Sequence, residues 1–218
     1  MIKKLLLFFA ILMLAGCSFS TPKNKWQLNS VNAFTSYEEY FLKGKESIAN
    51  VELKRAKNYA KQSADLMTLA RIELSSCALH VSVLQSAECK EYESLKPLVP
   101  SKELEAYNQF LAGALSELMV DELPSRYQNF ARYVAQKEYG KAQNALDSMD
   151  NIVSKMLAAS LIKKHLYPST VKNIINESSF YGYKKAVIAW TKFYINMNIE
   201  NNEKKKMLKI LEVIDDSK

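Results

Sequence analysis

Glycine and proline are scarce in this chain, which has only five of each among its 218 residues. Tight turns and β-hairpins depend on those residues, so their scarcity argues against a fold of many short strands. Runs of Val, Ile and Thr that alternate with polar residues, the pattern of half-buried strands, are also missing. The sequence therefore predicts an all-α fold of helices joined by short connections.

Residues that commonly carry catalysis or bind metals are also sparse. Of the two histidines, His80 lies among apolar residues and His165 follows two lysines, and neither has an acidic or cysteine partner at ligand spacing. The sequence contains no glycine-rich phosphate loop and no serine in a nucleophile elbow. We therefore predict a protein that is not an enzyme, with no catalytic residue, no metal site and no cofactor.

The N-terminus has the pattern of a secretory signal. Lys3 and Lys4 form a short positive region, and residues 5–14 are all apolar. About ten apolar residues are too few to span a bilayer permanently. The sequence Leu14-Ala15-Gly16-Cys17 then resembles the lipobox of bacterial lipoproteins. The alternative is an ordinary signal peptide with a chance Leu-x-Gly-Cys.

The lipoprotein resemblance implies a modification and an address. The thiol of Cys17 would receive a diacylglycerol, the chain would be cut before it, and the new amino terminus would be acylated. Ser18 follows, where the family's inner-membrane retention signal has Asp, so we expect attachment to the outer membrane, facing the periplasm. The expected partners are the membrane, through this lipid, and an envelope protein of unknown identity.

The charge of the chain is moderately positive. The formal net charge is +7, and removing Lys3 and Lys4 with the signal leaves +5. An exported protein seldom meets nucleic acid, so no nucleic-acid partner is expected. This balance fits a neighbourhood of anionic lipid head groups or a simply solvated surface.

Two cysteines remain once Cys17 is assigned to lipidation. Cys77 and Cys89 form an even pair, which in an oxidising compartment predicts a disulfide. One continuous helix would hold them roughly 18 Å apart, beyond the reach of a disulfide, so the chain must turn between them near residues 85–87. The alternative is two buried thiols within helices.

The sequence divides into three parts. Residues 1–16 are the expected signal peptide, 17–33 the lipidated N-terminus and tether, and 34–218 an all-α repeat-like domain. From Ser36 onward apolar residues recur at helical spacing, and prolines separate several of the segments. We expect about eight to ten helices of ordinary length.

Small residues mark two places where paired helices would approach closely. In the first, Gly44 lies in a leading helix and Ala56 in the helix after it. In the second, residues 136–139 form the turn between two helices, and Ala142, followed by Leu146, makes the close contact. These offsets resemble the tetratricopeptide repeat, a helix-turn-helix unit of about 34 residues.

The chain departs from that repeat in several positions. Phe130 and Met149 stand where small residues are expected, neither unit has the closing proline, and Ala56 and Ala142 are not a whole number of repeats apart. The expectation is therefore an irregular stack of antiparallel helix pairs, either a tetratricopeptide-like solenoid or a compact helical bundle.

In tetratricopeptide stacks the leading helices line a groove that binds partners. Carried onto this chain, the resemblance makes Phe41, Lys45 and Tyr127 the predicted partner-binding residues, with Ile48 and Ala131 beside them. The competing interpretation is that Phe41, Ile48 and Tyr127 belong to the core.

The predicted function is that of a lipid-anchored cell-envelope protein that acts as a non-catalytic scaffold or assembly factor. As an alternative, residues 160–210 contain ten lysines against three glutamates, a basic face that would bind anionic lipid or cell-wall polymer. A third alternative is a divergent peptidoglycan lytic enzyme, because residues 174–180 resemble the Glu-Ser segment of lytic transglycosylases, whose general acid would be Glu177. Only about forty residues follow Glu177, too few to complete that domain.

Overall fold

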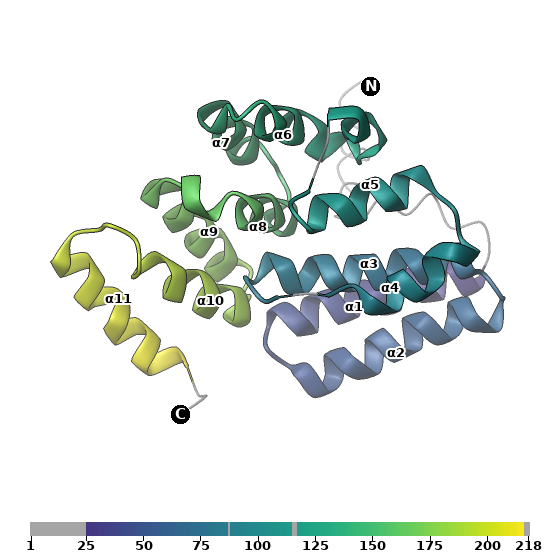
Figure 1. The fold of residues 1–218 in the computed structure, drawn as a ribbon. Coiled ribbons are helices and arrows are strands. Elements are labelled where there is room, and N and C mark those ends of the chain that lie inside the picture. Colours follow the sequence, from purple (N-terminus) through teal and green to yellow (C-terminus); the bar gives the residue numbers. More distant parts are fainter. Residues whose placement is uncertain (1–24, 87, 115–116, 216–218) are drawn as a thin grey trace, which may run out of the picture.

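A computed structural model describes residues 25–86, 88–114 and 117–215 of the chain (Figure 1). Within these ranges it contains eleven α-helices and no β-strand, which confirms the all-α prediction. The α-helices are α1 (Lys25–Leu42), α2 (Glu46–Gln62), α3 (Leu66–Ser82), α4 (Lys90–Leu95), α5 (Lys102–Leu111), α6 (Ser125–Ala135), α7 (Tyr139–Asp147), α8 (Ile152–Leu161), α9 (Pro168–Phe180), α10 (Lys184–Tyr194) and α11 (Asn201–Ile214). Three short 3₁₀ segments, η1 (Lys96–Leu98), η2 (Glu117–Glu122) and η3 (Lys163–His165), complete the list.

The first helix begins earlier than the sequence predicted. α1 starts at Lys25, inside the expected tether of residues 17–33, so the predicted boundary is wrong for its last residues. The reason is that Ser30 and Ala33 continue the buried face of Phe34 and Tyr37 backwards, although neither is strongly apolar. The expected signal peptide and Cys17 lie outside the described residues.

Six helices end in the same way, on a residue with a left-handed backbone. The six residues with positive φ are Gly44, Ala64, Leu84, Gly113, Lys137 and Gly182. In each case the next residue donates its N–H to the carbonyl oxygen five residues earlier, at N···O distances between 2.8 and 3.1 Å. This hydrogen bond closes the last helical turn and reverses the chain, which lets a sequence poor in glycine and proline make tight connections.

Three of these turns join helices that pack together as antiparallel pairs: α1 with α2, α6 with α7, and α9 with α10. The predicted turn at residues 136–139 is confirmed, and Ala142 is fully buried behind it. The expectation that Gly44 lies within a leading helix is wrong. Gly44 lies in the turn between α1 and α2 at φ +76°, so it supplies backbone freedom and not close packing within a helix.

The pairs are equivalent in their turns but unequally spaced along the chain. Ala49 is buried at the fifth position after Gly44, as Ala142 is at the fifth position after Lys137. The residue that matches Ala142 is therefore Ala49 and not the predicted Ala56, although Ala56 is also buried. The result is a stack of helix pairs without a constant repeat length.

α3 is the helix around which the pairs gather. It packs against α2, α5 and α8 and also contacts α1 and α4 (Figure 1). The pair α6–α7 lies on the far side of α5 and α8 from α1–α2, and α9–α10 closes one end of the stack. The strongest contacts of α11, the last helix, are with α10.

Cys77 and Cys89 form a disulfide, as the sequence predicted, with their Cα atoms 5.7 Å apart. α3 ends at Ser82 and the chain reverses at Leu84, so the expected turn between the two cysteines is present. The bridge fastens the short helix α4 to the central helix. A loop with a sequence separation of 12 residues contributes about 2–3 kcal/mol by the loop-entropy estimate.

Three buried hydrogen bonds made by side chains tie α3 and α2 to other helices. The Nε1–H of Trp190 in α10 donates to the carbonyl oxygen of Ser82 at 2.9 Å. The hydroxyl oxygens of Tyr37 in α1 and Ser76 in α3 lie 2.9 Å apart. The hydroxyl of Ser30 donates to the carbonyl oxygen of Ala56 in α2 at 2.9 Å.

The substitution Trp190→Phe tests the first of these ties. It leaves the carbonyl of Ser82 without its indole donor and removes part of a fully buried ring. We expect the free energy of unfolding to fall by about 2–4 kcal/mol, measured by urea denaturation. Trp26→Phe, at a half-buried position on α1, is the matched control and is expected to change it by less than half as much.

Candidate binding surfaces

Three of the five residues of the predicted partner groove are buried. Phe41, Tyr127 and Ala131 are buried, which agrees with the competing interpretation that the two aromatic residues belong to the core. Lys45 and Ile48 are exposed, and the Nζ of Lys45 lies 5.9 Å from the centre of the Tyr40 ring. Phe41 and Tyr127 are therefore unavailable to a partner in this structure, because their rings fill the spaces between helices.

Phe41 belongs to a junction that holds α10 against the first helices. The Nζ of Lys185 lies 3.9 Å from the centre of the Phe41 ring and forms an ion pair with Glu46. The hydrogen bond and charge of Lys185 hold the pKa of Glu46 below its usual value. His80 packs edge-on against Phe41 at 4.6 Å, and its Nδ1 lies 2.7 Å from Oε1 of Gln85. His80 is thus part of a packing contact.

Tyr127 lies in an aromatic cluster between α5 and α6. Its ring centre is 5.0 Å from that of Phe110 and 6.1 Å from that of Tyr107, and Phe130 packs edge-on against Phe110 at 6.2 Å. The repeat pattern expects a small residue at position 130. Phe130 stands there instead, and its ring fills the space beside Phe110.

Glu177, the residue on which the lytic-enzyme alternative depends, forms an ion pair. Its Oε1 lies 2.6 Å from the Nζ of Lys155, whose side chain is buried. Asp147 is near, and burial raises its pKa, against the charge of Lys155. A general acid must hold a proton before it reacts, whereas an ammonium group is the partner of an ionised carboxylate. The geometry favours a structural role for Glu177.

The second histidine is also engaged in packing. The ring of His165 stacks on that of Tyr139 at 3.5 Å between centres. Among the residues that the structure describes, no three His, Cys, Asp or Glu side chains gather where they could hold a metal ion. No helix in the described ranges is long and apolar enough to cross a membrane.

Among the residues that the structure describes, the most exposed aromatic group lies at the turn between α9 and α10. Phe180 is 83% exposed and Tyr181 is 47% exposed. The Phe180 ring stands edge-on to that of Tyr181 at 5.3 Å, and the Tyr181 ring stacks on that of Tyr183 at 5.5 Å. We call Phe180, Tyr181 and Tyr183 the aromatic turn.

The backbone of the aromatic turn is fixed by hydrogen bonds. The N–H of Gly182 donates to the carbonyl oxygen of Ser179 at 3.0 Å, and that of Tyr183 donates to Ser178 at 2.9 Å. Gly182 has φ +67°, a conformation that glycine adopts without strain. The three rings are therefore presented on a defined backbone, which lowers the entropy cost of binding a partner through them.

The sequence pattern located the aromatic segment but not this surface. Phe180 and Tyr181 come directly before Gly182, and glycine commonly follows the end of a helix. That glycine was the available signal that the two rings lie at a turn, where side chains are more often exposed.

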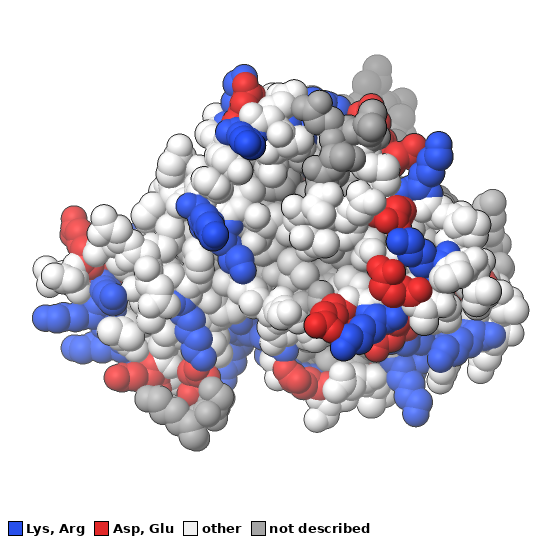
Figure 2. Space-filling model, in the orientation of Figure 1, with Lys and Arg blue, Asp and Glu red and all other residues white. Residues whose placement is uncertain are grey.

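The basic residues between 160 and 210 do not form one face. Lys172 pairs with Glu203, Lys185 with Glu46 and Lys192 with Asp215. In Figure 2 basic side chains lie over α11 and also at the opposite end of the same view, while uncharged side chains cover much of its middle. Of the other seven lysines in this range, four lie on the last helix: Lys204, Lys205, Lys206 and Lys209.

No family model matches the chain, and no curated protein and no solved structure shows significant similarity to it. Its function is therefore inferred from its residues and their geometry.

Glu38 in α1 is a partly buried carboxylate near the positive charge of Arg126. Burial raises the pKa of Glu38 from 4.5 to about 7, and Arg126 opposes that rise only in part. The folded state therefore favours the protonated carboxyl. The contribution of the protonated Glu38 carboxyl to the free energy of unfolding is fully present below about pH 4.5 and is lost as the pH rises to about 7.

The substitution Glu38→Gln removes this titration and keeps the shape of the side chain. We expect the variant to gain on the order of 1–2 kcal/mol relative to the wild type between about pH 4 and about pH 8, measured by urea denaturation. Glu39→Gln, at an exposed neighbouring position, is the control. Parallel pH profiles for the wild type and Glu38→Gln would contradict the assignment.

Proposed function

We propose that the chain is a lipid-anchored protein of the bacterial cell envelope that acts as a non-catalytic scaffold or assembly factor. The observation that carries the binding part of this proposal is the aromatic turn. Soluble domains rarely leave a large aromatic cluster in water without a partner for it. Aromatic side chains held on a rigid backbone are also the residues that most often dominate the energy of protein interfaces.

Two features support the envelope location. The sequence from Lys3 to Cys17 resembles a lipoprotein signal, and attachment to the outer membrane on its periplasmic side follows from that resemblance and from Ser18. The Cys77–Cys89 disulfide is the second feature, since such bridges persist in oxidising compartments and are rare in the reducing cytosol.

The proposal assigns the aromatic turn to an envelope protein partner. A partner pocket that takes up Phe180 and Tyr181 would remove both rings from water at little conformational cost, because their backbone is already fixed. Lys184 follows Tyr183 directly and is exposed, so the turn presents an aromatic contact surface with a positive charge beside it.

The double substitution Phe180→Ala/Tyr181→Ala tests the binding surface. Because both side chains are exposed, we expect the melting temperature to change by less than about 3 °C. Crosslinking in intact cells, followed by mass spectrometry, should show at least about a tenfold loss of a defined protein adduct. Tyr167→Ala, at a position 55% exposed, is the matched control and should leave the adduct unchanged. Equal adducts in all three proteins would contradict the assignment.

The substitution Cys17→Ala tests the anchor. We expect an uncleaved precursor that lacks the acyl mass, because the thiol that receives the lipid is gone, as intact-mass spectrometry of the membrane fraction would show. Cys77→Ala/Cys89→Ala is the control and should still be cleaved and acylated. A wild-type protein that starts downstream of Cys17 and fractionates without the membrane would refute the proposed anchor.

A further inference from the structure

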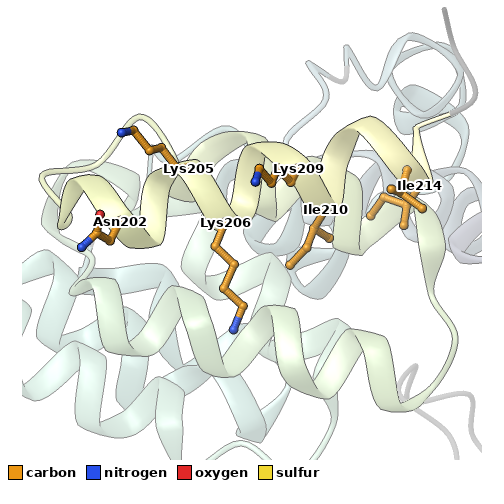
Figure 3. A pocket seen from close by; sticks show the side chains of 7 residues that line it. Asn202, Lys205, Lys206, Lys209, Ile210 and Ile214 are labelled. Atoms are coloured by element: carbon orange, nitrogen blue, oxygen red, sulfur yellow. The ribbon is translucent and has the colours of Figure 1, made fainter.

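α11 carries an exposed surface that the rest of the fold does not use. Two rows of side chains run side by side along it at four-residue spacing: Lys205, Lys209 and Val213 in one, and Lys206, Ile210 and Ile214 in the other. They line a shallow open groove (Figure 3). We call these six residues the α11 face. Val213 is 80% exposed and Ile210 is 37% exposed, so apolar side chains remain in water at its C-terminal half.

The opposite side of α11 is fixed to the domain. Leu211 is buried, Glu203 binds Lys172 at 2.6 Å, and Asp215 binds Lys192 at 2.6 Å. Two of the acidic side chains on or next to α11 are thus turned to the domain, while Glu200 and Glu212 are exposed. Within the described part of the chain, Lys204, Lys205, Lys206 and Lys209 make no ion pair. The helix therefore presents an excess of positive charge outwards.

We propose that the α11 face binds the surface of an anionic lipid membrane. Interfacial helices combine lysines that reach lipid phosphates with aliphatic side chains that enter the acyl boundary, and the α11 face presents both kinds of side chain on one side of the helix. The long lysine stems can reach the head groups while Ile210 and Val213 leave water. This assignment rests on the proposed function in one respect, since the anchor at Cys17 would bring the face to a membrane.

The shape of the groove favours lipid over an acidic protein segment. All of its lining residues in the described ranges come from α11, so it has no second helix as an opposing wall. A peptide helix is gripped between walls, whereas a membrane needs only a single open face. In Figure 3, Lys206 and Ile210 project from one edge of α11 and Lys205 from the other, so the face is broad and open.

The test uses the full chain reconstituted with vesicles and a polarity-sensitive dye on Val213→Cys. Val51→Cys, an exposed valine on α2, is the matched control position. One set of vesicles is neutral phosphatidylcholine, and the other also contains anionic phosphatidylglycerol. We expect a blue shift of the dye at position 213 with the anionic vesicles only, reversed by high salt, and no shift at position 51.

Charge variants identify the residues responsible. Lys205→Glu/Lys209→Glu should abolish the shift at position 213, whereas Lys54→Glu/Lys61→Glu, which makes the same charge change at exposed positions on α2, should preserve it. Equal loss in both variants would mean that net charge alone acts, and would overturn the assignment to α11.

The remaining outcomes separate this inference from the anchor. Protein that floats with both kinds of vesicle but shows no shift at position 213 refutes the α11 proposal and leaves the anchor standing. Protein that does not float with neutral vesicles refutes the anchor, and a shift with anionic vesicles would then still support α11. A shift with soluble polyglutamate and none with anionic vesicles would assign the face to an acidic protein segment.

Discussion

The hydrogen bond from Trp190 to the carbonyl of Ser82 holds the C-terminal helices against the N-terminal ones, and the rest of the stack depends on it. It spans 108 residues and joins α10 to the C-terminal end of α3. The last carbonyls of a helix have no partner inside that helix, so a buried one must find a donor elsewhere. Trp190 supplies this donor and fills the space beside it. Lys185, against Phe41 and Glu46, fixes the same helix at a second point.

Much of the fold could be predicted from the sequence, because helices show themselves by spacing and by the scarcity of glycine and proline. The disulfide followed from Cys77 and Cys89 and their compartment, and the turn at 136–139 from its offset to Ala142. The boundaries at Gly44 and Lys25 could not be predicted as well. A glycine such as Gly44 can serve close packing or a left-handed backbone, and the folded structure shows that Gly44 serves the second. Ala64, Leu84 and Lys137 adopt the same conformation without any glycine to indicate it.

The candidate sites were harder to predict, for a physical reason. A pattern at helical spacing identifies an apolar face but not which side of the stack that face meets. Phe41 and Tyr127 fill the core, while Phe180 lies in water, although all three are aromatic residues in helices. Their difference comes from packing between segments distant in the sequence. Likewise, ten lysines between residues 160 and 210 suggest one basic face, but ion pairs with Glu46, Glu203 and Asp215 engage three of them. Of the other seven, four lie on α11 and three lie on η3 and at the start of α10.

The two proposed attachments together constrain how the domain would sit. α1 has 18 residues and so spans about 27 Å. The proposed anchor precedes the first residue of α1. Lys185 holds α10 beside the C-terminal end of α1, and α11 packs on α10. Seven residues separate Cys17 from Lys25, and an extended chain of that length reaches about 25 Å, so contact of both Cys17 and the α11 face with one membrane limits how far α1 can tilt away from the surface. A single tether would leave the domain free to rotate, whereas two separated contacts fix its orientation, and with it the direction in which the aromatic turn is presented.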